Sequence, residues 1–174
     1  MSPTYLQATK STLERLGLRP ETLQHAPAAT SRLGNWTVNY VPIANRYAYL
    51  FMSDRTYLNF PILQGKQQIE LQDMPGFLQH GLSQLLESFG VSAELIKATL
   101  AELEVIAVTK VQDKSSLAVH AAIVSEYAHV LRLGGGANQN LSEAVLRVNN
   151  LPRRKLGGAT SQEATLGLLA SSAA

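Results

Sequence analysis

The sequence predicts a single α+β domain: a small antiparallel sheet of about four strands, with four to five helices packed mainly on one face. Two patterns along the chain lead to this prediction. Residues 35–62 alternate apolar and polar side chains and are broken by short turns, as antiparallel strands are. Residues 73–148 repeat apolar side chains at helical spacing, with one β-branched run between them. Strands followed by helices, rather than strict alternation of the two, favour this class.

The chain begins with a short predicted helix and a loop. Residues 9–16 are amphipathic, with Thr9 as the expected N-cap and Gly17 as the expected stop. Residues 19–31 are polar and contain Pro20 and Pro27, so we expect them to form a loop.

Three strands are predicted next. Residues 35–41 alternate strictly, which indicates a half-buried strand, and residues 47–52 are apolar on both faces, which suits a central strand. Residues 56–62 are a third strand, and Pro61 indicates that it lies at the edge of the sheet. A short helix capped by Ser53 or Asp54 is the competing interpretation of this third segment. Turns are expected at Asn45-Arg46 and at residues 53–55.

The second half of the chain is mostly helical. Residues 73–89 are the clearest helix, with apolar side chains at Met74, Phe77, Leu78, Leu82, Leu85, Leu86 and Phe89. Ser92 opens another helix, residues 104–109 predict a strand, and residues 115–133 predict the most buried helix. Residues 134–136 are three glycines that should end it, and residues 141–148 form a last short helix. We therefore expect one domain over residues 1–158 and a flexible tail over residues 159–174.

Composition bounds the class of protein. The 174 residues suit one domain, and 45% are hydrophobic while only 16% are charged, which raises the chance that an apolar surface meets a partner. The formal net charge of +2 divides into +3 for residues 1–60, −3 for residues 61–110 and +2 for residues 111–174. The chain has no cysteine, no signal peptide and no apolar run near the ~18 residues that span a bilayer. We expect a cytoplasmic protein that does not associate with membranes.

No catalytic or metal-binding motif stands out. His120 and His129 are nine residues apart on one predicted helix and point to opposite faces, so they cannot share a metal ion. We interpret His120 as a core histidine with satisfied hydrogen bonds. There is no GxSxG elbow and no SxxK, and the glycines at residues 134–136 end a helix rather than begin one. We expect no cofactor and no metal ion.

Two turns and one basic run are the candidate binding residues. The turns are Asp54-Arg55-Thr56 and Asp113-Lys114-Ser115, each with an acid, a base and a hydroxyl that would bind an anion if they converged. The alternative is that these residues cap helices and turns. The basic run is Arg153-Arg154-Lys155, which could contact phosphates from a flexible segment or could be a solvated surface.

The order of these features resembles a bacterial family known only as domain of unknown function 6933. The stretches that carry the resemblance are TKSTLERLGL (residues 9–18), LGNW (33–36), NRYAYLFMSDRTYLNF (45–60), TKVQDKSSLAV (109–119) and VNNLPRRKL (148–156). The resemblance implies a shared fold but no activity. At five positions this chain has the kind of residue that the family typically shows: Arg46, Ser53, Thr56, Lys114 and Ser115. The family tends to have a glycine and an asparagine where this chain has Ala118 and Ala121.

Three hypotheses for function follow. The first is a non-enzymatic interaction or regulatory module that binds a protein partner or itself, based on the low charge and the missing catalytic motifs. The second is a nucleic-acid-binding accessory or regulatory protein, based on the basic ends of the chain. The third is an unrecognised hydrolase or nuclease. The candidate binding residues are Arg46, Ser53, Thr56, Lys114, Ser115, Arg153, Arg154 and Lys155.

Overall fold

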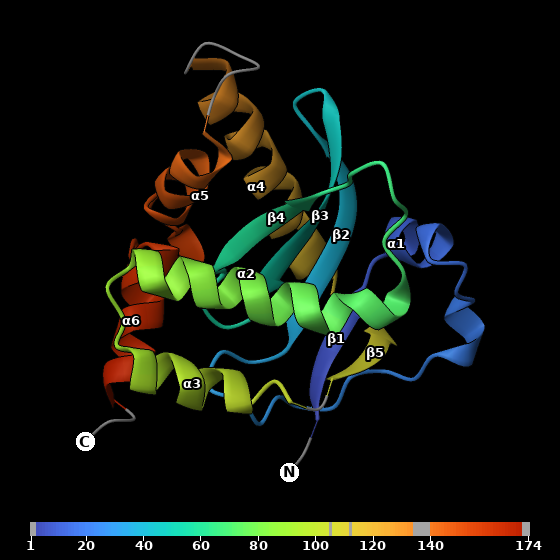
Figure 1. The fold of residues 1–174 in the computed structure, drawn as a ribbon, viewed down its shortest axis with the longest axis horizontal. Helices are drawn as coiled ribbons and strands as arrows, with labels where there is room; N and C mark the ends of the chain where they lie inside the picture. Colours follow the sequence, from blue (N-terminus) through green and yellow to red (C-terminus); the bar gives the residue numbers. More distant parts are fainter. Residues whose placement is uncertain (1–2, 105, 112, 134–139, 172–174) are drawn as a thin grey trace.

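The structure is a computed structural model that describes residues 3–104, 106–111, 113–133 and 140–171. It confirms the α+β class. Within these residues the chain forms five strands in one mixed sheet, in the order β4-β3-β2-β1-β5, together with six α-helices (Figure 1). The predicted end of the helix at residues 134–136 lies outside the described residues. None of the described helices is both long and apolar enough to cross a membrane.

The centre of the sheet is the predicted antiparallel meander. Strands β2 (Trp36–Ile43), β3 (Arg46–Ser53) and β4 (Asn59–Leu63) pair in sequence order, and the turn between β2 and β3 holds Ala44 at a positive φ of 54°. Strand β4 is an edge strand, as Pro61 indicated, so the competing helix interpretation of this segment is wrong.

The sheet has one strand more than we expected, and this strand runs parallel to its neighbours. Strand β1 (Thr4–Ala8) pairs in parallel with β2 and with β5 (Ile106–Lys110), so the sheet is mixed rather than wholly antiparallel. The sequence does not predict β1, because its buried positions are Thr4, Leu6 and Ala8, and only Leu6 is a large apolar residue. Five residues with one such side chain give too weak an alternation to predict a strand.

Helices cover both faces of the sheet, where we had expected one. Helices α1 (Lys10–Arg15), α2 (Met74–Ser88) and α3 (Ala93–Ala101) share a core with Val38 and Phe51. Helices α4 (Lys114–Leu133) and α5 (Leu141–Asn149) pack on Leu50 and Met52 from the other side. Strand β3 is apolar on both faces and therefore requires a helical layer on each. Figure 1 shows α2 and α4 on either side of the strands.

The end of the chain is a helix where a flexible tail was expected. Helix α6 (Ser161–Ser171) buries Ser161, Thr165 and Leu169. Its start carries a capping box: the Thr160 N–H donates to the Glu163 carboxylate (2.9 Å), and the Glu163 N–H donates to Thr160 Oγ1 (3.1 Å). The Thr-x-x-Glu spacing is visible in the sequence, but the small, weakly amphipathic residues that follow it concealed the helix.

Candidate functional site

Tyr57 follows the first of the two predicted turns and senses the charge of both. Its pKa is raised first by burial and then by the carboxylates of Asp113 and Asp54, one from each turn. Lys155 joins them, because its Nζ donates to the Ser115 carbonyl at 3.5 Å. Hydrogen bonds from Ser115 and, more weakly, the Lys155 charge hold the pKa of Asp113 below its usual value. Acidic and basic groups therefore meet here in comparable number.

Asp54 and Tyr57 have unusual environments within this group. Burial raises the pKa of Asp54 to about 6 against the opposing charge of Arg55, and its Oδ1 has no hydrogen-bond partner. Tyr57 has a φ of 56°, in the left-handed region that side chains larger than glycine rarely adopt. The turn is packed closely around Asp54, since a Cβ on Gly34 would come within 1.8 Å of its Oδ1.

Two of the candidate binding hydroxyls form internal hydrogen bonds. Ser53 Oγ donates to the Leu33 carbonyl at 2.6 Å and accepts from the N–H of Arg55 and of Thr56. Thr56 Oγ1 accepts from Thr165 Oγ1 at 3.0 Å, and both Ser53 and Thr56 are buried. These two side chains build the turn and attach α6 to it, which is the structural alternative considered for them.

The basic run at residues 153–155 is divided by the fold. Arg153 is 7% exposed, and its Nη1 donates to both carboxylate oxygens of Glu126 at 2.7 Å. It is therefore an internal ion pair rather than a cation on a flexible segment. Arg154 is exposed, and Lys155 reaches only the Ser115 carbonyl. The residues form a short 3-10 helix, Arg154–Leu156, ended by Gly157.

The remaining candidates are exposed, and one of them is remote from the rest. Lys114 and Ser115 begin α4, where the Ser115 N–H donates to Asp113 Oδ1 at 2.8 Å. Arg46 pairs with Ile43 at the turn of the β2–β3 hairpin, at the opposite end of β3 from Ser53. The structure therefore brings Lys114, Ser115 and Lys155 together and leaves Arg46 apart.

The histidines form no reactive arrangement in the described residues, where no group of three or more His, Cys, Asp or Glu side chains could hold a metal ion. His120 is fully buried, as predicted, but neither of its ring nitrogens has a hydrogen-bond partner. The expectation of satisfied hydrogen bonds is therefore wrong. An imidazole without a partner activates no nucleophile.

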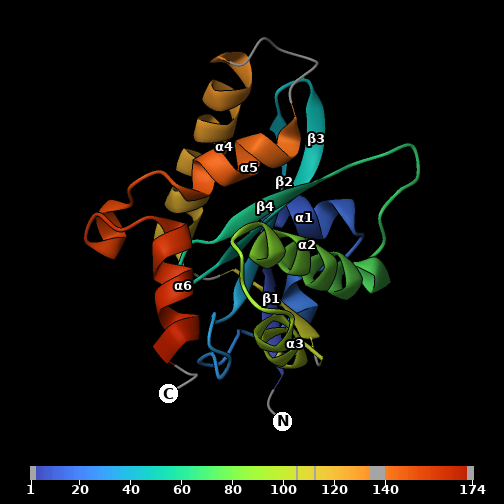
Figure 2. The same cartoon turned by 60° about the vertical axis from the view of Figure 1, so that its left-hand side comes forward.

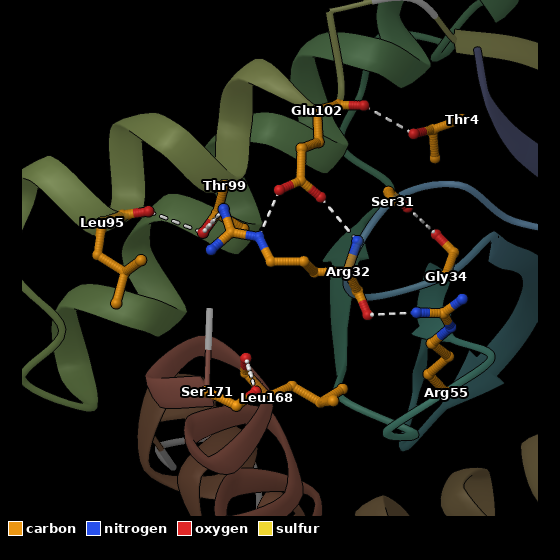
Figure 3. Close-up of polar contacts among 10 residues, drawn as sticks. All are labelled: Thr4, Ser31, Arg32, Gly34, Arg55, Leu95, Thr99, Glu102, Leu168 and Ser171. Atoms are coloured by element: carbon orange, nitrogen blue, oxygen red, sulfur yellow. Dashed lines mark hydrogen bonds and ion pairs between the residues drawn. The ribbon is translucent and has the colours of Figure 1, made fainter. Parts of the chain in front are cut away.

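A network around Arg32 fixes the loop that precedes β2 (Figure 3). The Arg32 Nε is paired with the Glu102 carboxylate, which also accepts from the Arg32 N–H at 2.7 Å. Thr4 Oγ1 donates to the Glu102 carbonyl at 2.8 Å, and Arg55 Nη1 donates to the Arg32 carbonyl at 3.2 Å. Glu102 thus joins the end of α3 to β1 and the loop, and its charge is neutralised there.

Helices α2 and α3 line a groove of ≈ 640 Å³ that we call the acidic groove. The apolar residues that line it are Val91, Ala93, Ile96, Leu100 and Ala101. The polar residues that line it are Gln79, Glu87, Lys97 and Glu104. The charge pattern of residues 61–110 signalled an acidic region, but the groove depends on the packing of α3 against α2, which periodicity does not show.

One known family matches this chain. Its sequence profile, described as Domain of unknown function (DUF6933), matches residues 5–164. The match spans the sheet, α1 to α5 and the first turn of α6. No curated protein and no solved structure matches the chain.

Proposed function

The chain belongs to the DUF6933 family, whose description carries no activity, and from its geometry we propose a non-enzymatic interaction module. Its partner is a protein that presents a basic, amphipathic segment to the acidic groove. The observation that supports the proposal is the combination of an apolar lining with an excess of acidic side chains between α2 and α3.

The charge of this region selects a basic partner. Residues 73–104 contain five acidic side chains and one basic side chain, Lys97. Arg32 neutralises one of the five, Glu102, on the other side of α3. Glu87 and Glu104 line the groove, and neither forms an ion pair with a described residue. Lysine or arginine side chains at the edge of a docked segment would therefore meet complementary charge.

The lining favours a peptide segment over a small metabolite. Small-molecule sites combine an apolar wall with several polar groups that converge on the ligand. Here Gln79 is occupied, since its Nε2 donates to the Leu103 carbonyl at 2.9 Å. Partly exposed apolar side chains such as Val91 and Leu100 instead offer contacts for the apolar face of a helix, the common mode of helix-in-groove recognition.

Two synthetic peptides of equal length test the proposal: an amphipathic peptide of lysine and leucine, and its counterpart of glutamate and leucine. We expect the basic peptide to bind and to shift the backbone amide signals of α2 and α3 in NMR spectra. The double variant Glu87→Gln, Glu104→Gln should weaken this binding several-fold. A matched control, Glu14→Gln with Glu143→Gln, removes two exposed carboxylates elsewhere and should leave it unchanged.

Two results would contradict the proposal. One is equal binding of both peptides, because the acidic side chains would then play no part in recognition. The other is a shift of the same amide signals on dilution of the protein alone. That result would assign the groove to a second copy of this chain.

A further inference from the structure

Beyond that proposed function, we propose that two tyrosines on the β2–β3 hairpin form a site that stacks the bases of single-stranded nucleic acid. The tyrosine platform consists of Tyr40 and Tyr47, which are supported by the fully buried Tyr49. It belongs to a different part of the fold from the acidic groove and has the opposite local charge.

The platform is a product of strand register. Tyr40 and Tyr49 are direct cross-strand partners, with ring centroids 4.8 Å apart, and Tyr47 lies two residues before Tyr49 on the same face of β3. Tyr40 and Tyr47 are stacked, with centroids 5.1 Å apart and an interplanar angle of 17°. The hairpin projects beyond the rest of the sheet (Figure 1). The aromatic row therefore runs from the buried Tyr49 through the half-buried Tyr40 to the exposed Tyr47.

Tyr47 offers an open ring face. Its side chain is 54% exposed although it stacks on Tyr40, so one side of the ring is covered and the other is free. A free aromatic face beside an existing stack is the element on which unpaired bases bind in proteins that recognise single strands.

Arg15 of α1 adds a cation to the stack. Its guanidinium carbon lies 5.4 Å from the centroid of the Tyr40 ring, within the range of a cation–π contact. The side chain is exposed and can also reach a phosphate. The same guanidinium interacts with the Tyr49 hydroxyl and opposes the rise in its pKa that burial causes.

The segments that frame the platform are basic. They are α1, the hairpin from Tyr40 to Tyr49, and residues 64–67, which follow β4 and are tied to Tyr47 by a hydrogen bond from the Gln64 N–H to the Tyr47 carbonyl (2.9 Å). Four basic residues and one acidic residue occur in these segments: Lys10, Arg15, Arg46 and Lys66 against Glu14. Glu14 is already paired with Lys10. An excess of exposed cations beside stacked rings suits a phosphate backbone with unpaired bases.

Single strands, rather than duplexes, fit this arrangement. The bases of a duplex are stacked on one another and cannot present their faces to Tyr47, whereas an unpaired base can. The basic segment proposed as the partner of the acidic groove is disfavoured here, because this surface is itself basic.

Fluorescence anisotropy of a labelled oligothymidine at low salt tests the proposal on the full chain. We expect Tyr47→Ala to weaken binding by about fivefold or more, from the usual contribution of one base–aromatic stack. Tyr47→Phe should retain binding, because it keeps the ring. Arg15→Ala should lower the slope of log affinity against log salt by about 0.7, the value for one phosphate contact on a single strand.

Matched controls and thermal melts separate binding from folding. Leu117→Ala removes another exposed apolar side chain, and Arg147→Ala removes another exposed arginine; neither should change the affinity. Equal effects of Tyr47→Ala and Leu117→Ala would overturn the proposal. So would a failure of the wild-type protein to bind, or a duplex of the same length that binds as tightly as the single strand.

Discussion

His120 is a histidine whose position could be predicted and whose environment could not. Its place on the apolar face of α4 follows from the spacing of the apolar residues around it, and it is fully buried. Whether a buried imidazole finds a hydrogen-bond partner depends on which strand side chains lie opposite. Here neither ring nitrogen has a partner, and burial alone lowers the pKa from 6.5 to about 4.

The first prediction concerns acid stability through His120. Because the folded pKa is lower than the unfolded one, the contribution to stability is complete above pH 6.5 and is lost as the pH falls toward 4. The full loss is about 3 kcal/mol. His120→Leu should remove this pH dependence and cost little at pH 7, since it breaks no hydrogen bond. Urea unfolding from pH 4 to pH 7.5 measures both effects, and an unchanged slope in the variant would contradict the assignment.

The second prediction concerns Asp54, which acts in the opposite direction. Burial raises its pKa from 3.8 to about 6, so its contribution to stability is present below pH 3.8 and is lost as the pH rises through 6. The effects of Asp54 and His120 therefore oppose each other between pH 4 and pH 6. Asp54→Asn should raise the free energy of unfolding at pH 7. Below pH 6 the loss of stability that His120 causes should become steeper, because Asp54 no longer offsets it. A melting temperature that is lower than wild type at pH 7 would show that the ionised carboxylate is instead required.

At the scale of elements, the outer edge of β4 is closed by one side chain. Its outward-facing backbone groups belong to Asn59, Pro61 and Leu63, since the alternate residues face β3. Asn149 of α5 pairs with Asn59 as a strand would: its Oδ1 accepts from the Asn59 N–H (3.0 Å), and its Nδ2 donates to the Asn59 carbonyl (2.8 Å). Pro61 has no N–H to leave unpaired. The first part of the edge, from Asn59 to Pro61, is thereby protected from pairing with another chain.

The third prediction follows from this pairing. Asn149→Ala removes both hydrogen bonds and leaves buried backbone groups of Asn59 unsatisfied, which should cost about 1–3 kcal/mol. The variant should also aggregate more readily, because part of an edge strand becomes available. Its neighbour Asn150 is exposed, so Asn150→Ala is the matched control and should unfold close to wild type. Equal denaturant midpoints for the two variants would contradict the role given to Asn149.

Local signals in the sequence located most elements. Thr9 and Ser92 cap their helices as predicted, and Pro61 placed β4 at the edge. For two elements these signals were weak. Strand β1 buries one large apolar residue, and the clearest signal for α6 is the Thr160–Glu163 capping box. The only sign of the second helical layer in the sequence is that β3 is apolar on both faces. Pairing direction and layer assignment are tertiary properties that a single segment does not encode.

At the scale of the molecule, the predicted charge distribution maps onto two separate surfaces. The acidic residues 61–110 contribute α2, α3 and the acidic groove, while the basic first third contributes α1 and the hairpin of the tyrosine platform. The sign of each region could be predicted from the sequence. The tyrosines were recognised only as strand residues, because the stacking of Tyr40 on Tyr47 requires the register between β2 and β3.

Arg153 is the residue that joins the helices on one side of the whole molecule. Its guanidinium is paired with Glu126 of α4, its Nη2 donates to the Val148 carbonyl of α5 at 3.0 Å, and its Nε donates to Ser161 Oγ of α6 at 3.4 Å. Figure 2 shows these three helices meeting on one side of the sheet. A side chain in such a position was expected from the sequence to be a solvated cation.

The last prediction separates the two roles of the basic run. Removing one member of a buried ion pair leaves the other charge uncompensated, so Arg153→Ala should cost about 3–5 kcal/mol. Arg154→Ala combined with Lys155→Ala should melt like wild type, since these side chains are exposed. Replacing both partners by apolar residues, Arg153→Met with Glu126→Leu, should recover much of the loss because no charge then remains buried. Thermal melts of the three proteins decide the matter: equal losses for Arg153→Ala and the Arg154–Lys155 variant would mean that Arg153 contributes no more than a surface charge.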